Sequence, residues 1–288
     1  MPAPRAKFLL RLLLLGLLAA EAQAADSVVL IAGDVAQCNV PGARLTGQLI
    51  ASMPDAAVLA AGDLAYPTGS AQDFARCYAP AWGAFKARTF PAPGNHEYET
   101  PGAAGYFDYF GVRAGERRKG YYSFDLGAWH ILSLNSQRAL EADAAQLQWL
   151  DADLRQHRQR CVLAYWHHPR YSSGPHGSNA QMQALWALLQ RHGVSVVVAG
   201  HEHFYERFAP MNAQGERDAL HGMRSFVVGT GGTQLYPLQQ RLPLSEAAQD
   251  RSWGVLKITL HATGYAWDFL PVAGQTFHDA GSAQCAAR

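Results

Sequence analysis

The sequence has almost no net charge. Its 24 Lys and Arg are matched by 23 Asp and Glu, which leaves a formal charge of +1 over 288 residues. Proteins that bind nucleic acid or anionic membranes through charge concentrate basic residues. The balanced composition therefore excludes a charge-driven nucleic-acid binder, and we expect no nucleic-acid partner.

Internal repeats, low-complexity segments and clustered cysteines are also missing. The composition, with 49% hydrophobic and 11% aromatic residues, is typical of a folded globular protein. No two cysteines are spaced as CxxC or CxxxC. Zinc held by a cluster of thiolates is therefore not expected.

Only one long apolar run occurs, and it stands at the start of the chain. It covers Phe8–Ala20, follows two basic residues and precedes the small-residue pattern Ala22–Ala24. A membrane-spanning helix needs about 20 apolar residues, and this run is shorter and contains Arg11. We therefore expect residues 1–24 to be a secretory signal peptide. Residues 25–288 are then expected to form a single domain, secreted or periplasmic, without stable membrane insertion; the oligomeric state is left open.

The four cysteines predict disulfides, because exported proteins keep their cysteines oxidised. Four cysteines allow three pairings, and the sequence leaves all three open. Our working choice is Cys38 with Cys77 and Cys161 with Cys285.

The hydrophobic pattern predicts an α/β fold. Short apolar runs bounded by glycine or polar turns are typical of strands buried on both faces: residues 28–32, 57–61, 89–92, 161–166 and 194–199. Helical spacing lies between them at residues 71–86, 139–158 and 179–192. Alternating segments at residues 121–135, 224–228 and 254–270 predict added antiparallel strands. We expect two mixed sheets packed as a sandwich and flanked by helices.

Oxygen and imidazole side chains directly follow five predicted strands. In chain order the blocks are Gly33-Asp34, Gly62-Asp63-Leu64-Ala65-Tyr66, Gly94-Asn95-His96-Glu97, His167-His168 and Gly200-His201-Glu202-His203. Ligands of open α/β sheets bind at the carboxyl ends of the strands. Taken singly, Gly33-Asp34 is typical of a turn, Asn95 of a helix cap or turn, and His167-His168 of one core and one surface histidine. The alternate histidines of the fifth block are a stronger signal. Together the five predict a metal site on one rim.

These blocks resemble the calcineurin-like metallophosphoesterases, and among them the purple acid phosphatases. The family pattern is an Asp block, GDxxY, GNH[DE], a histidine at a strand end, and GHxH, in this order. Residues 62–66, 94–97 and 200–203 match without substitution, and residues 203–207 resemble the HxYER continuation of plant-type members. The resemblance covers essentially the whole chain after residue 24.

The choice of subfamily rests on Asp34 and Tyr66. Most calcineurin-like diesterases begin with DxH, but Asp34-Val35-Ala36 contains no histidine. In the purple acid phosphatases the tyrosine of GDxxY binds Fe(III) as a phenolate and gives the colour. The chain is similar to the small, single-domain form of that family.

The resemblance implies a binuclear metal centre. Fe(III) would be held by Asp34, Tyr66 and His203, the second ion, Fe(II), Zn(II) or Mn(II), by Asn95, His167 and His201, and Asp63 would bridge the two. Such a pair of ions makes a hydroxide available to attack phosphorus and offsets transition-state charge. The sequence does not decide the second metal or the pH optimum.

The resemblance also implies catalytic roles for two histidines. His96 would bind phosphate or donate a proton, and His176 is a second candidate for protonating the leaving group. Glu97 is expected to orient His96 through its carboxylate. His168 matches no ligand of the family and is assigned no catalytic role.

We therefore expect an exported metallophosphatase acting on small phosphate monoesters. A phosphodiesterase of the same superfamily acting on nucleotides or lipid head groups is an alternative, because the loops at residues 99–119 and 170–180 decide access. A non-catalytic metal-binding protein is an alternative of another class. It would have no use for His96 and His176.

Overall fold

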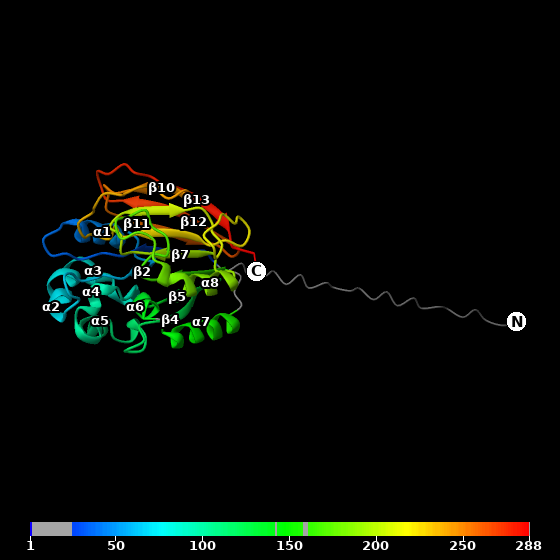
Figure 1. Cartoon of the computed structure of the whole chain (residues 1–288), viewed down its shortest axis with the longest axis horizontal. Helices are drawn as coiled ribbons and strands as arrows, with labels where there is room; N and C mark the ends of the chain where they lie inside the picture. Colours follow the sequence, from blue (N-terminus) through cyan, green and yellow to red (C-terminus); the bar gives the residue numbers. More distant parts are fainter. Residues whose placement is uncertain (2–24, 142, 158–160, 288) are drawn as a thin grey trace.

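The structure is a computed structural model that describes residues 1, 25–141, 143–157 and 161–287. Two mixed sheets pack face to face with helices outside them, which confirms the predicted α/β sandwich (Figure 1). Apart from Met1, the predicted signal peptide lies outside the described residues. Within the described ranges, no helix has the length and apolar character needed to cross a bilayer.

The first sheet has six strands in the order β13-β12-β11-β1-β2-β3. Their bounds are β1 Ser27–Ala32, β2 Ala57–Ala61, β3 Thr89–Ala92, β11 Gly254–Leu260, β12 Gly264–Pro271 and β13 Ala280–Gln284. Strands β1, β2 and β3 run parallel, whereas β11, β12 and β13 add antiparallel neighbours. The parallel strands are the apolar runs that the sequence identified.

The second sheet has seven strands in the order β10-β8-β9-β7-β6-β5-β4. Their bounds are β4 Tyr122–Leu126, β5 Trp129–Ser133, β6 Cys161–Tyr165, β7 Val196–Ala199, β8 Tyr205–Phe208, β9 Arg224–Val228 and β10 Ser245–Gln249. The prediction of only antiparallel additions is partly wrong, because β5 is parallel to β6 and β9 is parallel to β7. The turn at Gly127 reverses the chain after β4, so β5 takes the direction of β6.

The helical segments are shorter and more numerous than predicted. They are α1 Gly42–Ala51, α2 Ala71–Asp73, η1 Phe74–Tyr78, α3 Ala79–Trp82, η2 Gly83–Arg88, α4 Asn95–Tyr98, η3 Pro101–Ala103, α5 Ala104–Phe110, η4 Gly111–Ala114, α6 Ser136–Leu140, α7 Ala144–Gln156, η5 Ala180–Met182 and α8 Gln183–Arg191. The predicted helix 71–86 changes type along its length, because Pro80 offers no N–H to continue α-helical bonding. The predicted helix 139–158 is divided where Asp143 caps α7.

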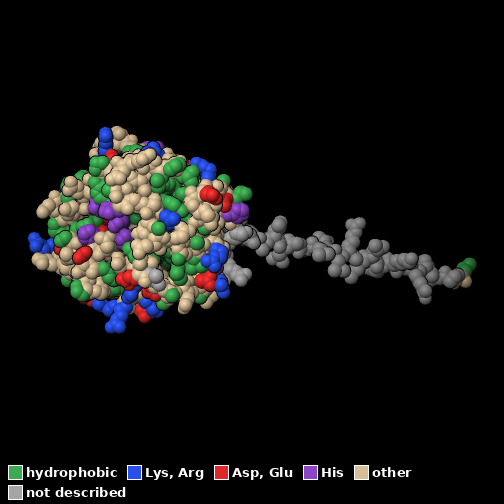
Figure 2. All heavy atoms as spheres, viewed as in Figure 1, with side chains coloured by type: hydrophobic (Ala, Val, Ile, Leu, Met, Phe, Trp, Pro, Cys, Tyr) green, Lys and Arg blue, Asp and Glu red, His purple; other side chains and the backbone are tan. Residues whose placement is uncertain are grey.

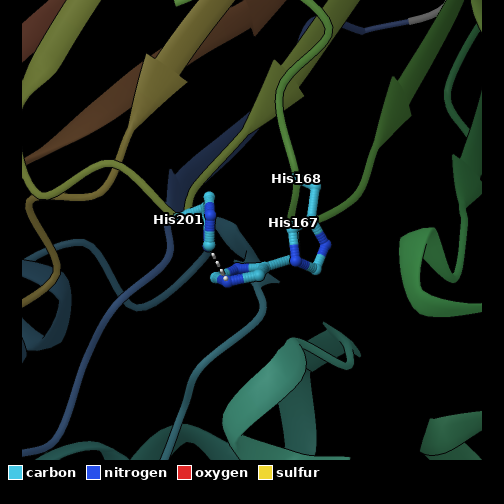
Figure 3. Close-up of side chains that lie close together, drawn as sticks. All are labelled: His167, His168 and His201. Atoms are coloured by element: carbon cyan, nitrogen blue, oxygen red, sulfur yellow. Dashed lines mark hydrogen bonds between the residues drawn. The ribbon is translucent and has the colours of Figure 1, made fainter. Parts of the chain in front are cut away.

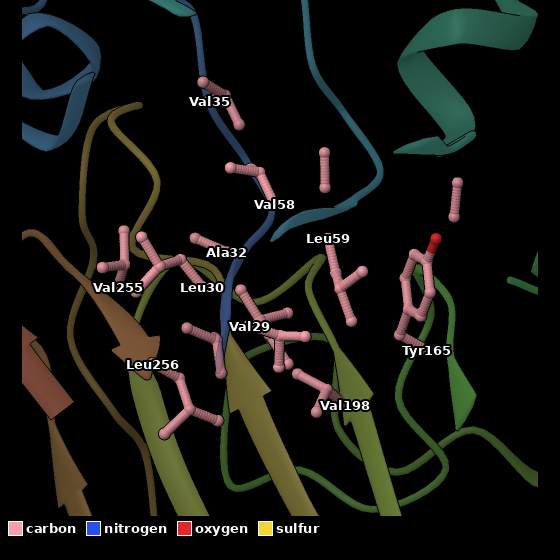
Figure 4. Close-up of a cluster of buried hydrophobic side chains, with 14 of the residues drawn as sticks. Val29, Leu30, Ala32, Val35, Val58, Leu59, Tyr165, Val198, Val255 and Leu256 are labelled. Carbon is pink, nitrogen blue, oxygen red and sulfur yellow. The ribbon is translucent and has the colours of Figure 1, made fainter. Parts of the chain in front are cut away.

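Strand β6 shows how the two hydrophobic clusters are separated. Cys161, Leu163 and Tyr165 point into the core between the sheets, while Val162 and Ala164 pack with α7 and α8 on the outer face. Figure 4 shows the inner cluster, where side chains of β1, β2 and β11 meet Tyr165 and Val198 of the other sheet. Burying each such side chain contributes about 1.5–3 kcal/mol. The sandwich is therefore held mainly by apolar burial.

Both disulfides have the pairing that we favoured. Cys38 is bonded to Cys77, with 4.7 Å between their Cα atoms, and Cys161 is bonded to Cys285, with 5.4 Å. The first ties the loop after β1 to η1. The second joins β6 to the segment after β13 and so links the two sheets.

Candidate metal centre

The predicted ligands meet where the two sheets adjoin. Strands β1, β2 and β3 of the first sheet lead into Asp34, Asp63 and Asn95, while β6 and β7 of the second lead into the histidines. Histidine side chains gather on this face of the molecule (Figure 2). The rim expected from the sequence is thus built from both sheets.

Three predicted ligands have an unusual backbone conformation. Asp34, Asp63 and His201 have positive φ angles of 59°, 52° and 71°. An L-residue pays about 1 kcal/mol or more for this left-handed region, and such residues cluster at functional sites. Backbone hydrogen bonds offset the cost, including Asp34 N–H to the Gly62 carbonyl at 3.0 Å.

The first donor group surrounds His167. Its Nε2 lies 3.0 Å from Asp63 Oδ2, 3.2 Å from Asn95 Oδ1 and 3.3 Å from His201 Nδ1. Its Nδ1 lies 3.0 Å from the Ala61 carbonyl, and donation there leaves Nε2 free to face the other donors. Figure 3 shows the His167 and His201 rings joined by the marked hydrogen bond. We call Asp63, Asn95, His167 and His201 the His167 set.

The second donor group surrounds Tyr66. Its Oη lies 3.1 Å from Asp34 Oδ1, 3.2 Å from His203 Nε2 and 3.4 Å from Asp63 Oδ2. His203 Nδ1 is 2.9 Å from the Gln234 carbonyl, which turns Nε2 toward the tyrosine. We call Asp34, Asp63, Tyr66 and His203 the Tyr66 set. Asp63 belongs to both sets.

The electrostatics of both sets favour cations. Burial together with the charges of Asp34 and Asp63 raises the pKa of Tyr66 well above its ordinary value. Burial lowers the pKa of His167, but the charges of Asp63 and Asp34 outweigh it and raise that pKa to about 9. Two buried carboxylates thus need positive charge nearby. Carboxylate, imidazole, amide and phenol donors fit iron, zinc or manganese.

Glu97 does not orient His96, contrary to the prediction. Its buried carboxylate accepts N–H bonds from Asp63, Leu64 and Gly94 at 2.9, 2.8 and 2.8 Å. It therefore clamps the loop after β2 against the loop after β3. The side chain turns back because it occupies the third position of α4, where a carboxylate reaches free N–H groups.

Both predicted catalytic histidines lie at the edge of the centre. His96 is 33% exposed, its ring centroid is 4.4 Å from that of Tyr66, and its Nδ1 contacts the Pro67 carbonyl. His176 is 55% exposed and lies 4.6 Å from the His201 ring. These positions leave both side chains accessible to a bound substrate.

His168, which the sequence left without a role, is buried beside the His167 set. Its ring lies near that of His201 (Figure 3), with 4.4 Å between the two centroids. Its Nδ1 lies 2.8 Å from Ser136 Oγ. Burial and the charge of His167 lower the pKa of His168 to about 3. The ring is therefore neutral.

Two residues that sequence reasoning missed support His176. Buried Glu202 accepts the His176 and Gly177 N–H groups at 3.0 and 3.1 Å. Tyr236 donates its hydroxyl to Glu202 at 2.9 Å, and its ring stacks on His203. Because Glu202 stands between the candidate ligands His201 and His203, the sequence could have indicated that it belongs to the site. The sequence around Tyr236 contains no such indication.

Comparison with protein families gives one match that covers most of the chain. The sequence profile of the calcineurin-like phosphoesterase family matches residues 10–205. This range contains every predicted ligand and both predicted catalytic histidines.

Curated relatives match over parts of their length. Purple acid phosphatase 21 of Arabidopsis thaliana is 40% identical over 32% of this chain and 22% of that protein. Purple acid phosphatase 15 of the same plant is 30% identical over 55% of this chain and 37% of that protein. A nucleotide pyrophosphatase/phosphodiesterase of Hordeum vulgare is 24% identical over 69% of this chain and 63% of that protein. The chain thus matches less than two thirds of each relative.

Two solved structures share the fold. Purple acid phosphatase PPD1 from yellow lupin seeds has a TM-score of 0.69 at 22% identity, over 91% of this chain and 54% of that chain. GAP50, described as the anchor in the inner membrane complex of Plasmodium, has a TM-score of 0.73 at 12% identity, over 91% of this chain and 90% of that chain. At these identities the likeness concerns the fold alone.

Proposed function

Because the chain belongs to the calcineurin-like phosphoesterase family, we propose that it is an exported metallophosphatase that hydrolyses phosphate monoesters. The observation that carries the proposal is the sharing of Asp63 between the Tyr66 set and the His167 set. One carboxylate between two donor groups suits a binuclear centre.

We assign Fe(III) to the Tyr66 set and Fe(II), Zn(II) or Mn(II) to the His167 set. A phenol with its pKa raised by burial and by neighbouring carboxylates ionises only beside a strong cation, which favours the trivalent ion there. When bound, the two ions lower the pKa of a water molecule and withdraw charge from phosphoryl oxygens.

The chain's own residues bind the ester and supply a proton. His96 faces the centre through Nε2, 3.9 Å from Asp63 Oδ2, because its Nδ1 is directed to the Pro67 carbonyl. We assign it a hydrogen bond to the phosphoryl group. Glu202 holds the backbone of His176, and we assign its exposed ring the protonation of the departing alcohol oxygen.

The test compares a monoester with a diester. We expect the purified protein to hydrolyse p-nitrophenyl phosphate faster than bis(p-nitrophenyl) phosphate. His96→Ala and His176→Ala are expected to keep both metals and lose about 100-fold in kcat, the usual loss for a general acid. His278→Ala is the control, because this side chain is 71% exposed. Unchanged turnover in both site variants would remove the assigned roles.

A phosphodiesterase is the second candidate, because the Hordeum vulgare relative is named a nucleotide pyrophosphatase/phosphodiesterase. Preference for the diester substrate would favour it. A non-catalytic role is a third candidate, since the named anchor GAP50 has the same fold. Two bound metals without hydrolysis of either ester would favour that role.

Export and the single domain of residues 25–288 are part of the proposal. Both disulfides suit an oxidising compartment. Sequencing the amino terminus of the exported protein tests the signal peptide. The expected first residue is Ala25, and retention of residues 1–24 would contradict it.

A further inference from the structure

A surface groove leads away from the metal centre toward two arginines. It consists of three adjoining hollows of about 330, 390 and 230 Å³. The first is lined by Tyr66 and His203, the second by Tyr66 and Arg76, and the third by Arg76 and Arg44. Gln37 lines all three, so we call the whole feature the Gln37 groove.

Arg44 and Arg76 are exposed and uncommitted. Among the described residues, neither guanidinium makes an ion pair, a hydrogen bond or a ring contact. The carboxylate that shares their groove, Asp73, accepts hydroxyl hydrogen bonds from Thr68 and Ser70 at 2.8 Å each. The groove is therefore lined by two arginines without partners in the described part of the chain and by one carboxylate that already accepts hydrogen bonds.

A disulfide fixes Arg76 relative to the centre. Cys77 adjoins Arg76 in η1, and its partner Cys38 lies four residues after Asp34 in the loop that leaves β1. The bond holds the two segments with 4.7 Å between the Cα atoms. Arg76 thus keeps its place beside the Tyr66 set.

We propose that the Gln37 groove binds a second phosphate group, so that the protein prefers phosphate monoesters carrying another phosphate. This inference rests on the proposed function. The planar guanidinium of arginine matches phosphate oxygens in pairs, and such charge-assisted bonds are the strong ones. The distant phosphate keeps its charge during hydrolysis, so the groove binds it equally well in the ground state and in the transition state. Binding there therefore lowers KM and leaves kcat unchanged.

The kinetic test uses fructose 1,6-bisphosphate and fructose 6-phosphate. In the double variant Arg44→Gln/Arg76→Gln we expect kcat/KM for the bisphosphate to fall at least about tenfold, because the loss of even one charge-assisted contact has about this effect. For the monophosphate, kcat/KM of the double variant should stay within about twofold of the wild-type value. Arg251→Gln is the matched control, because that side chain is 93% exposed and lines none of these hollows. Equal changes for both substrates would overturn the proposal.

A binding measurement separates this inference from the proposed function. Calorimetry with inorganic tripolyphosphate and with orthophosphate needs no turnover. We expect the double variant to lose about tenfold in affinity for tripolyphosphate alone. If neither sugar phosphate is hydrolysed but this selective loss occurs, the proposed activity fails and the groove stands. Unchanged tripolyphosphate affinity overturns the groove, whatever the activity.

Discussion

His167 Nε2 lies 3.0 Å from Asp63 Oδ2, and this contact joins the two sheets at the metal centre. Asp63 follows β2 of the first sheet, whereas His167 follows β6 of the second. The His167 set therefore exists only while the sandwich is closed. The metal binding proposed for this set would therefore be coupled to folding.

Replacing Tyr66 tests the assignment of iron. Tyr66→Phe removes the hydroxyl that lies 3.1 Å from Asp34 Oδ1 and 3.2 Å from His203 Nε2. We expect the wild-type protein to show a broad visible absorption band and the variant to lose it while keeping bound metal. A band that survives would contradict tyrosinate ligation. Two metals without any band in the wild type would move the protein toward the generic phosphoesterases.

Gly62 packs closely against His167, so replacing it with alanine, which adds one methyl group, should destabilise the protein. Gly62 has a φ of 81°, and an added Cβ would lie 2.5 Å from His167 Nδ1. Gly102 has a similar φ of 64°, but nothing lies within 4 Å of its Cβ position. Gly102→Ala should cost about 1 kcal/mol of unfolding free energy through backbone strain alone.

Gly62→Ala should cost more than Gly102→Ala and also lower the metal content, because the His167 ring must move. Urea unfolding and metal analysis of both variants measure this. Equal stability losses with full metal content in both would refute the packing argument.

Tyr236 is expected to act through His176. Its hydroxyl lies 2.9 Å from Glu202 Oε2 and 3.3 Å from His176 Nδ1. Tyr236→Phe should lower kcat about fivefold with little change in KM, as expected for the loss of one positioning hydrogen bond. In a His176→Ala background the same change should have no further effect. Additive losses would show that Tyr236 acts independently.

His130 lies away from the proposed metal centre, and its contacts should make the folding stability of the protein depend on pH. Its buried ring lies 2.7 Å from both Asp125 Oδ1 and Asp153 Oδ2. Burial lowers the pKa of His130, but the hydrogen bonds to Asp153 and Asp125 raise it above its ordinary value. Protonated His130 therefore stabilises the folded state. This contribution is complete below the pKa of His130 in the unfolded chain, about 6.5, and is lost as the pH rises through its pKa in the folded protein.

His130→Gln should accordingly cost about 1 kcal/mol more at pH 5.5 than at pH 9, measured by urea unfolding. His278→Gln, on a ring that is 71% exposed, should change little at either pH. Equal losses from His130→Gln at both pH values would show that packing alone explains its effect.

Local prediction worked best where short-range chemistry decides the structure. The buried strands were found because apolar runs covered on both faces leave a clear pattern, as in Cys161–Tyr165. Helix 71–86 was predicted too simply, because periodicity does not register that Pro80 lacks an N–H. The role of Glu97 was missed because the sequence does not show which N–H groups its carboxylate reaches.

The sequence by itself determined the candidate donors and their order, because each predicted ligand lies within five residues after a strand whose apolar run marks its end. It also determined the absence of a DxH histidine, which made Tyr66 informative. Only the tertiary structure decided that these strand ends belong to two sheets and that Asp63 lies between the two donor sets. It also decided the place of Tyr236 and the Gln37 groove. Such contacts join residues far apart in the chain, and packing of the two sheets fixes them.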